Sequence, residues 1–543
     1  MRERFQSSRL LLALAAILFI QIFYRLGGLG LTGPDEPRYA QVAREMVDSA
    51  DWITPRLHGK PWFEKPILYY WLAALGYLAF GVSEFAARLG SALAGAAGAC
   101  AVFWVARRVW DAQVGFWSVC VLLTSMLYFA LSRAASMDAL LTGTLTVALC
   151  SLALMLAEEK SPSESRTRGG DSWAWVLLYL SLGLSTLAKG PVGVLLIGTT
   201  LLLTVLLSGC WRFLKRASIL KGGLLYLVVA VPWFWLCYRS NGQVFVEEFL
   251  WQHNLERFTT DRYQHAQPFW FYVPVLLIGF LPWSFQLISA GWERVRRRFR
   301  FEQKEDRVEL LLWVWLGVAL LFFSVSKSKL PGYILPVAPA VAILVGRHVS
   351  ALMGRSPTVD LAMPGRIVVL QGITLAVAGG LLPFQAERFT WDVGSTVWIF
   401  SVLLVTGGAA GVILGMRRRF RALVLTYVAC VVVLTLLVTW RLFPRLGPSV
   451  SARELAGFVA GQGYSGQPLL VLGVPRSTQY GLDFYLNTES RIVYSTDDIR
   501  RFQDREVLLV SQEDDPRLKA LTPEGHRHSA VHRRFRVIRF VPH

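Results

Sequence analysis

The sequence predicts an all-α protein that crosses a membrane many times and ends in a small α/β domain. Of its 543 residues, 54% are hydrophobic and only 17% are charged, and the mean hydropathy is +0.43. Long apolar runs recur until about residue 443, whereas the remaining residues mix polar and apolar types. These observations exclude a water-soluble protein of several domains.

Charge and cysteine content exclude two further classes of protein. The formal net charge is +19, but Lys and Arg fall in short clusters between apolar runs rather than along one face. We therefore predict no nucleic-acid partner. The six cysteines lie in or beside apolar runs without the paired spacing of a disulfide or zinc framework, so they are expected to pack as small hydrophobic residues.

Thirteen apolar runs are long enough to cross a bilayer as helices, which takes roughly 17 to 25 residues each. They lie near 9–28, 86–107, 112–131, 136–157, 173–189, 192–209, 219–238, 268–290, 308–326, 330–348, 365–384, 395–416 and 421–443. A fourteenth run, 67–81, is short and follows a polar segment, so we expect it to stay at the interface.

The basic clusters set the expected orientation. If residues 67–81 do not span, the clusters at 294–300 and 417–421 lie on the same side as the N-terminus. Positive charge is retained in the cytoplasm, so this arrangement predicts a cytoplasmic N-terminus and a C-terminal tail on the outer side. The first apolar run follows Arg2, Arg4 and Arg9 but has no clear cleavage site, which favours an uncleaved anchor.

Two outer segments have patterns of their own. In the first outer loop, residues 29–66, an apolar face alternates with a polar one at helical spacing, which predicts an interfacial amphipathic helix. The apolar face comprises Tyr39, Ala43, Met46 and Val47, and the polar face comprises Arg38, Gln41, Glu45 and Asp48. We place a domain boundary at 444, with a transmembrane domain at 1–444 and an α/β domain at 445–543. The second domain is expected to hold a helix near 452–459 and strands near 469–474, 491–494, 507–511 and 535–541.

Charged and hydrogen-bonding residues gather at the predicted outer ends of the spans, and no equivalent set is expected at the inner ends. Ionisable groups at this depth are expensive to bury, so the set predicts a polar cavity. Its carboxylates can take a proton or orient a hydroxyl, and its cations can hold a phosphate, which suits a lipid-linked substrate whose phosphate leaves. The set comprises Asp35, Glu36, Arg38, Tyr39, Glu64, Lys65, Arg133, Asp138, Lys189, Arg257, Lys327, Lys329 and Tyr333.

Structural explanations stay open for several of these residues. Asp35 and Glu36 can serve as first-turn acids of the amphipathic helix. Lys65 and Arg133 can reach lipid headgroups. The segment 189–191 can be a break between two spans, and the segment 327–333 can provide anchors and a proline-initiated helix. His253 and His265 are twelve residues apart and have no cysteine near them, so their pattern does not predict a zinc site.

Seven segments in order resemble a known family. They are Asp35–Ala40, Asp51–Pro55, Trp62–Pro66, Ala188–Pro191, His253 with Arg257 and Phe258, Gln264–His265 with Pro268–Trp270, and Lys329–Tyr333. Together they resemble the bacterial aminoarabinose transferases of lipid A, which belong to the GT-C class of polyprenyl-phosphate-sugar-dependent glycosyltransferases. The resemblance covers roughly the first 335 residues.

The resemblance implies a GT-C fold with about thirteen transmembrane helices and a periplasmic tail in the bacterial inner membrane. It implies that a sugar is transferred with inversion from undecaprenyl phosphate to an acceptor on the periplasmic side. The sugar that fits the resemblance best is 4-amino-4-deoxy-L-arabinose, and the acceptor that fits it best is a lipid A phosphate. By the same resemblance, Asp35 and Asp138 are the catalytic residues. The expected substrate-binding residues are Arg38, Tyr39, Glu64, Lys65, Lys189, Arg257 and Tyr333.

Cofactor and acceptor are less closely defined. The superfamily allows a divalent metal at Glu64 or His253, although no residue pattern in the sequence requires one. Pro37 stands where the lipid A enzymes tend to have glycine, and a proline beside Asp35 would reshape the turn nearest the acceptor. Transfer to a protein, another glycolipid or a surface polysaccharide is therefore the alternative, and a lipid-linked sugar transporter is a weaker one.

Overall fold

The computed structural model describes residues 2–158, 173–211, 218–249, 267–297, 299–301, 303–354, 362–388, 394–502, 506–520 and 526–540. The chain divides into two compact units. The first comprises Met1–Leu26, Phe63–Tyr69 and Arg88–Val438, and the second comprises Gly27–Trp62, Tyr70–Ala87 and Thr439–His543. Most of the first outer loop thus belongs to the same unit as the tail, while the domain boundary at residue 444 stays a prediction.

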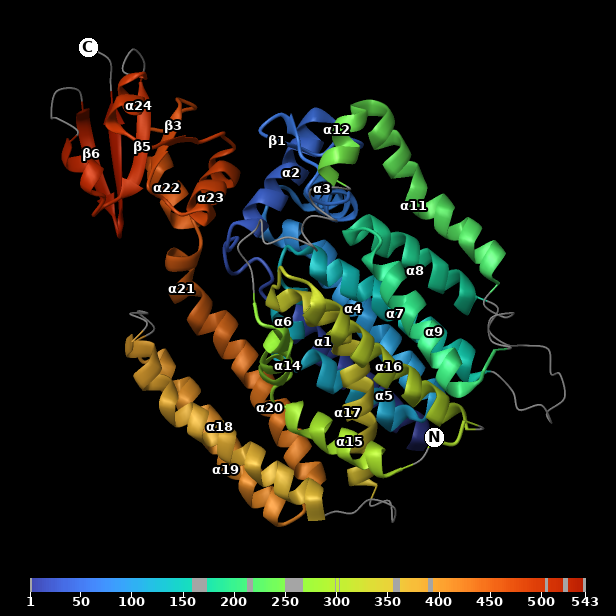
Figure 1. Ribbon diagram of the computed structural model, residues 1–543. Coiled ribbons are helices and arrows are strands. Elements are labelled where there is room, and N and C mark those ends of the chain that lie inside the picture. The colour runs from blue at the N-terminus through green and yellow to red at the C-terminus, as the bar shows by residue number, and fades with distance from the viewer. Residues whose placement is uncertain are drawn as a thin grey trace. The chain divides into compact units, whose positions relative to one another are not determined.

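The first unit is helical, and every predicted span coincides with one helix or with two or three consecutive helices (Figure 1). Its elements are α1 (Arg2–Leu18), η1 (Phe19–Phe23), most of α4 (Glu84–Val109), α5 (Ala112–Leu123), α6 (Met126–Ser132), α7 (Met137–Ala157), α8 (Ala174–Lys189), α9 (Val192–Ser208), α11 (Ile219–Asn241), α12 (Gln243–Phe245), η3 (Phe269–Phe271), α14 (Tyr272–Gly279), α15 (Ser284–Arg296), α16 (Lys304–Val325), η4 (Pro331–Val337), α17 (Ala338–Met353), α18 (Ala362–Arg388), α19 (Thr396–Met416) and α20 (Phe420–Leu437).

Length and hydropathy confirm a protein that crosses a membrane several times. Within the described ranges, eight helices are long and apolar enough to span, or ten if two bent helix pairs each count as one span. α1 with η1, α8 and α9 are apolar but shorter than these. The number thirteen therefore stays a prediction. The fourteenth apolar run, 67–81, forms α3 (Leu68–Phe80). Its 13 residues extend only about 20 Å, which is less than the thickness of a hydrocarbon core of about 30 Å.

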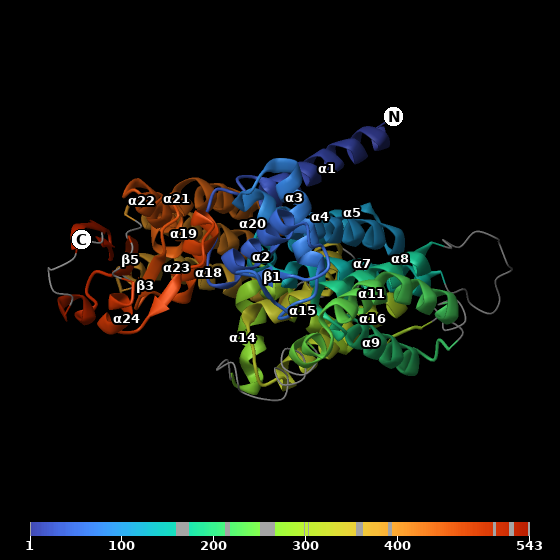
Figure 2. The ribbon, with the colours of Figure 1, turned by 90° about the horizontal axis from the view of Figure 1, so that it is seen from above.

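α7 is the central helix of the first unit. The most apolar 18-residue stretch of α7 is 89% buried, whereas that of α11 is only 17% buried. Helix α8 packs against both of them (Figures 1 and 2). A Cβ on Gly143 of α7 would lie 2.5 Å from the carbonyl oxygen of Ala94 in α4. Glycine therefore lets the two backbones approach closely, as is common where membrane helices pack through small residues.

The second unit begins with the first outer loop. This loop forms α2 (Asp35–Ser49), the short strands β1 (Arg56–Leu57) and β2 (Lys60–Pro61), and leads into α3. The predicted helix is confirmed, and it buries Tyr39, Ala43 and Met46 of its predicted apolar face, whereas Val47 is only partly buried. It also buries Gln41, which the sequence pattern placed on the polar face. The helix ends at Ala50, whose φ of 54° is left-handed.

The tail folds as the predicted α/β domain, following η5 (Val438–Leu442) and α21 (Phe443–Val450). Its sheet has the order β4-β3-β5-β7-β6; β4, β3 and β5 are parallel, and β7 is antiparallel to β5 and to β6. Alternate residues of the central strands feed separate apolar cores on the two faces. The elements are α22 (Arg453–Gly461), β3 (Leu469–Leu472), α23 (Arg476–Leu486), β4 (Arg491–Val493), α24 (Thr496–Arg500), β5 (Val507–Gln512), η6 (Pro516–Ala520), β6 (His526–His532) and β7 (Phe535–Phe540).

Candidate active site

Asp138 stands at the first turn of α7, where the helix start fixes its position. Ser136 caps the helix, and its Oγ accepts a hydrogen bond of 3.1 Å from the backbone N–H of Asp138. Ser136 in turn exchanges two hydrogen bonds with Ser91 of α4, at 3.1 and 3.2 Å. A carboxylate in this position is stabilised by the helix dipole, and its backbone is held by two neighbouring helices.

Lys189 and Tyr333 complete a cluster with Asp138. Lys189 is the last residue of α8, and its ammonium donates to Asp138 Oδ1. The Lys189 Nζ also lies 4.0 Å from the ring centroid of Tyr333, in η4. The cation is therefore held between a carboxylate and an aromatic face, and about a fifth of each charged side chain is exposed. The structure thus brings together three predicted site residues from three separate segments.

The backbone around the cluster leaves little free space. A Cβ on Gly332 would lie 2.9 Å from Asp138 Oδ2, so a larger residue would press on the carboxylate. The Tyr272 hydroxyl donates to the carbonyl oxygen of Leu330 at 3.1 Å, which fixes the start of η4. Gly190 ends α8 with a φ of +78°. The segment 189–191 is therefore both a break between two helices and the place from which Lys189 joins the cluster.

Glu64 and Lys65 form a second buried pair in the first unit. Their side chains lie 3.3 Å apart, and each residue is 9% exposed. Beside them, Phe63 packs edge-on against Phe245 of α12, with ring centroids 5.1 Å apart. A buried lysine and carboxylate at the end of an apolar segment suit the binding of a polar head group.

Asp35, Arg38 and Tyr39 lie together in the second unit, on the first turns of α2. Arg38 donates to Asp35 Oδ1 at 2.6 Å, and its guanidinium lies 5.3 Å from the Tyr39 ring centroid. The Asp35 side chain is 52% exposed, against 14% for Arg38. Pro37 occupies the first turn, where its missing N–H removes no intrahelical hydrogen bond, so α2 forms normally beside Asp35.

Three members of the predicted polar set have structural partners. Glu36 accepts hydrogen bonds from the backbone N–H and hydroxyl of Thr32, at 2.8 and 3.0 Å. Arg133 is buried and donates to the carbonyl oxygens of Gln21, Ile22 and Tyr24, so it caps the end of η1 rather than reaching for lipid. Lys329 donates to the carbonyl oxygens of Gln267 and Ser326. Arg257, His253 and His265 lie outside the described residues.

The expectation that no comparable set lies at the other helix ends is wrong. Arg294 of α15 lies 3.1 Å from Glu309 of α16, which also pairs with Arg347 of α17. Glu293 binds His348 at 3.0 Å and Arg297 at 2.6 Å. The sequence showed Arg294 and Arg297 only as part of a basic cluster. The acidic partner of Arg294, Glu309, lies on a different helix, and the pairing depends on how the helices pack. The opposite charges there are paired, which indicates a structural role.

The metal hypothesis finds little support among the described residues. No group of three His, Cys, Asp or Glu side chains is gathered there as a metal would need. Glu64, one of the two possible ligands, instead lies 3.3 Å from the cationic group of Lys65, which would repel a metal ion, and the other, His253, lies outside the described residues. We therefore assign no step of the reaction to a metal.

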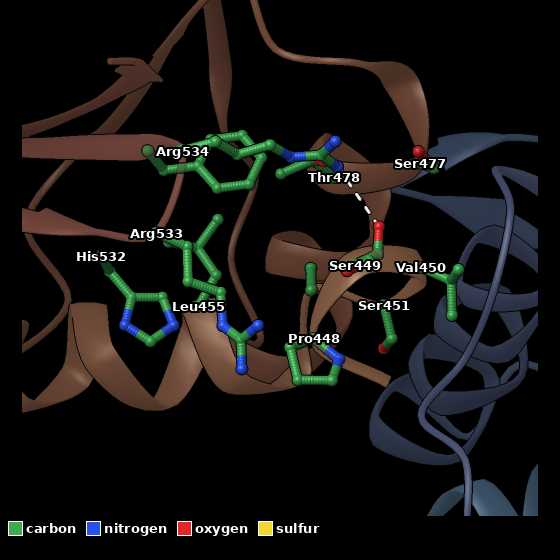
Figure 3. A pocket seen from close by; sticks show the side chains of 12 residues that line it. Pro448, Ser449, Val450, Ser451, Leu455, Ser477, Thr478, His532, Arg533 and Arg534 are labelled. Carbon is green, nitrogen blue, oxygen red and sulfur yellow. Dashed lines mark hydrogen bonds between the residues drawn. The ribbon is translucent and has the colours of Figure 1, made fainter. Parts of the chain in front are cut away.

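A separate pocket of about 200 Å³ lies in the tail (Figure 3). It is bordered by the end of α21, the start of α23 and the β6–β7 hairpin. Arg534 donates to the carbonyl oxygen of Ser449 at 3.2 Å, and Arg533 pairs with Glu454 at 3.3 Å. Because both arginines are engaged in local contacts, the pocket resembles a packing defect beside the hairpin more than a reaction site.

Comparisons with known proteins agree with this architecture. A family model described as dolichyl-phosphate-mannose-protein mannosyltransferase matches residues 64–236. The crystal structure of ArnT from Cupriavidus metallidurans bound to undecaprenyl phosphate superposes with a TM-score of 0.80 at 24% identity, covering 98% of this chain and 97% of that one. The fold is therefore that of a polytopic membrane glycosyltransferase.

Sequence relatives define the family within that class. The undecaprenyl phosphate-alpha-4-amino-4-deoxy-L-arabinose arabinosyl transferase of Pseudomonas paraeruginosa is 33% identical over 389 residues, which cover 71% of this chain and 67% of that one. The protein of the same name from Edwardsiella ictaluri is 34% identical over 383 residues, covering 70% of this chain but only 65% of that one. The chain belongs to the family of undecaprenyl phosphate-alpha-4-amino-4-deoxy-L-arabinose arabinosyl transferases, which confirms the resemblance seen in the sequence.

Proposed function

We propose that the protein transfers 4-amino-4-deoxy-L-arabinose from undecaprenyl phosphate to a phosphate of lipid A. The observation that carries the proposal is the ammonium of Lys189, fixed between Asp138 and the Tyr333 ring in the membrane unit. A fixed cation at the edge of a membrane domain suits a lipid-linked phosphate. The sugar and its lipid carrier are those named for the relatives, and lipid A phosphate is the acceptor that the resemblance in the sequence implies.

The reaction is a direct displacement at the anomeric carbon. An acceptor oxygen attacks that carbon from the face opposite the donor phosphate, and the bond between the carbon and the phosphate oxygen breaks. The electron pair leaves with the phosphate, which stays attached to its lipid, and the configuration at the carbon inverts. Because negative charge grows on the departing phosphate, a cation aimed at it stabilises the transition state more than the ground state.

Lys189 is the residue that we assign to the departing phosphate. An ammonium has three N–H donors, and Asp138 takes one of them, so two remain for phosphate oxygens. Asp138 keeps the ammonium in place before the donor arrives, and Tyr333 limits its movement from the other side. Glu64 and Lys65 are the candidates for binding the donor head group.

Asp35 is assigned to the acceptor. A lipid A phosphate is already an anion, so its attack requires no proton removal, and the carboxylate then mainly orients it. A hydroxyl acceptor would have to lose a proton, which a carboxylate can accept. The half-exposed Asp35 is open to such an acceptor.

The expected location follows from the charge pattern of the loops. We infer a bacterial inner-membrane protein with its N-terminus in the cytoplasm and its tail in the periplasm. The cluster of Asp138, Lys189 and Tyr333 supports the order of crossings, because it brings three span ends to one side, while the loop charges alone support the orientation. All three residues lie at predicted outer ends of spans.

Mass spectrometry of lipid A tests the proposed function. Cells that express the protein are expected to add one amino-pentose to a lipid A phosphate, and cells without it are not. The Asp35→Asn variant should lose the addition, whereas Asp48→Asn, an exposed aspartate on the same helix, should retain it. Unchanged lipid A with the protein present in the membrane would contradict lipid A as the acceptor. Extension of a protein, glycolipid or polysaccharide would then identify the alternative.

A further inference from the structure

Helix α23 of the tail makes specific contacts with the first outer loop, inside the second unit. Arg44 of α2 donates to the backbone carbonyl of Phe484 at 3.0 Å. His58 Nε2 lies 3.3 Å from Asp483, whose side chain is 1% exposed. A helix of 15 residues such as α2 is marginal in isolation, so contacts of this kind fix where it lies.

The start of the loop is attached to the same helix. The Tyr485 hydroxyl accepts from the backbone N–H of Leu31 at 2.8 Å and donates to Glu84 at 3.0 Å. Arg453, in α22, binds the same Glu84 oxygen at 3.1 Å and also donates to the carbonyl oxygen of Gly28 at 3.2 Å. The segment before α2 and the helix itself are therefore held by one face of the tail.

A third contact reaches the predicted acceptor residue. The Arg38 guanidinium lies 5.6 Å from the ring centroid of Tyr480 in α23 and 5.3 Å from that of Trp62. Two aromatic rings, one from the loop and one from the tail, thus flank the guanidinium that donates to Asp35. Aromatic rings on both sides restrict the rotation of a guanidinium and so fix the direction of its N–H donors. The carboxylate of Asp35, which accepts from these donors, is thereby also held in one orientation.

We propose that the C-terminal domain positions Asp35 for the acceptor, with Tyr480 of α23 acting through Arg38 as the positioning residue. This inference rests on the proposed function of Asp35, but the attachment of the loop can be tested without it. It gives the tail a role in the reaction although no tail residue needs to touch the substrates.

The experiment compares full-length variants in lipid nanodiscs. Tyr480→Leu removes the ring, Tyr480→Phe keeps it, and Tyr494→Leu makes the same change at a tail tyrosine that is 72% exposed. The readouts are amide hydrogen exchange in peptides covering 35–49 and steady-state transfer with saturating undecaprenyl-phosphate-linked aminoarabinose and varied lipid A.

Tyr480→Leu is expected to speed exchange in residues 35–49 several-fold. It should also lower kcat/KM for lipid A at least about tenfold, as for other losses of orientation. Tyr480→Phe and Tyr494→Leu should stay within about twofold of the wild type in both readouts. If Tyr480→Phe behaves like the wild type while Tyr480→Leu does not, the aromatic ring itself is what positions Arg38, and a general loss of folding is excluded as the cause.

Three outcomes distinguish the inference from the proposed function. Exchange and kcat/KM that are both unchanged in Tyr480→Leu would overturn the positioning role. Wild-type protein without any transfer would overturn the proposed reaction, and faster exchange in Tyr480→Leu would then still establish that the tail holds the loop. Faster exchange with unchanged kcat/KM in an active enzyme would overturn the claim that this attachment serves Asp35.

Discussion

The ammonium of Lys189 donates to Asp138 Oδ1, so the two residues act as one unit in the membrane domain. Each of them could be predicted from the sequence as a site residue, but their pairing could not. The residue types and their places at helix ends were readable, because charged groups in an apolar chain are conspicuous. The direct contact between them depends on how α7 and α8 pack, which no local pattern reports. The predicted roles of the two residues are therefore coupled, since any change to one alters the charge balance of the other.

Replacing Lys189 by methionine tests this coupling. The change removes the charge but keeps a flexible side chain, so Asp138 loses its cation and, in the proposed mechanism, the departing phosphate loses its stabilising donor. We expect kcat to fall by about 100-fold or more, which is the usual range for a lost electrostatic stabiliser. Steady-state transfer kinetics of purified protein would measure it.

Lys327→Met is the matched control, because this lysine is exposed and near the same predicted membrane side. It should leave kcat within about twofold. A Lys189→Met enzyme with near-normal kcat would show that the ion pair serves folding only.

At the scale of elements, the apolar runs of the sequence predicted the membrane helices and the buried strands. Some elements rich in polar residues have no such run and were missed. The predicted strands near 469–474 and 507–511 are confirmed as β3 and β5, because buried parallel strands are continuously apolar. The predictions omitted α23 and β6. In α23, polar residues such as Asp483 are buried against other segments, and in β6 the strand is rich in histidine, so neither shows a simple periodicity.

The contact between His58 and Asp483 predicts that the attachment of the first loop weakens as pH rises. Burial by itself would lower the pKa of His58, but the hydrogen bond and negative charge of Asp483 outweigh it and raise the pKa above the usual 6.5. The contribution to stability is then complete below about pH 6.5 and is lost as pH rises through the raised value. Hydrogen exchange of residues 35–49 should accordingly be faster at pH 8.5 than at pH 6, after correction for the intrinsic rate.

His58→Asn is the informative variant, because asparagine tolerates the left-handed φ of 54° at this position. Its corrected exchange should be as fast at pH 6 as that of the wild type at pH 8.5. A wild-type protein whose corrected exchange does not change between the two pH values would argue against this ionic contact.

At the scale of the whole molecule, two charge clusters report on topology independently. Asp138, Lys189 and Tyr333 meet although they stand at the ends of the fourth, fifth and tenth predicted spans. The cluster around Glu309 joins the opposite ends of the eighth, ninth and tenth predicted spans. Residues that touch must share a side, so these contacts agree with the order of crossings that the apolar runs predict.

Labelling of single cysteines would establish the orientation. In a cysteine-free background, Ser465→Cys in the tail should react with a membrane-impermeant maleimide in intact spheroplasts. Lys304→Cys, in a predicted inner loop, should react only after the membrane is opened. The reverse pattern would show that the chain is inserted the other way, and with it that the proposed acceptor side is wrong.

The attachment of the first loop to α23 also has a consequence in time. Arg44 and Phe484 are 440 residues apart, and the ribosome adds about 5 to 20 residues per second. For roughly 20 to 90 seconds after its synthesis, the loop that carries Asp35 therefore lacks its partner helix. A chain whose synthesis stops before α23 would hold the membrane cluster but leave that loop unattached, because both contacts of the loop with Asp483 and Phe484 need that helix.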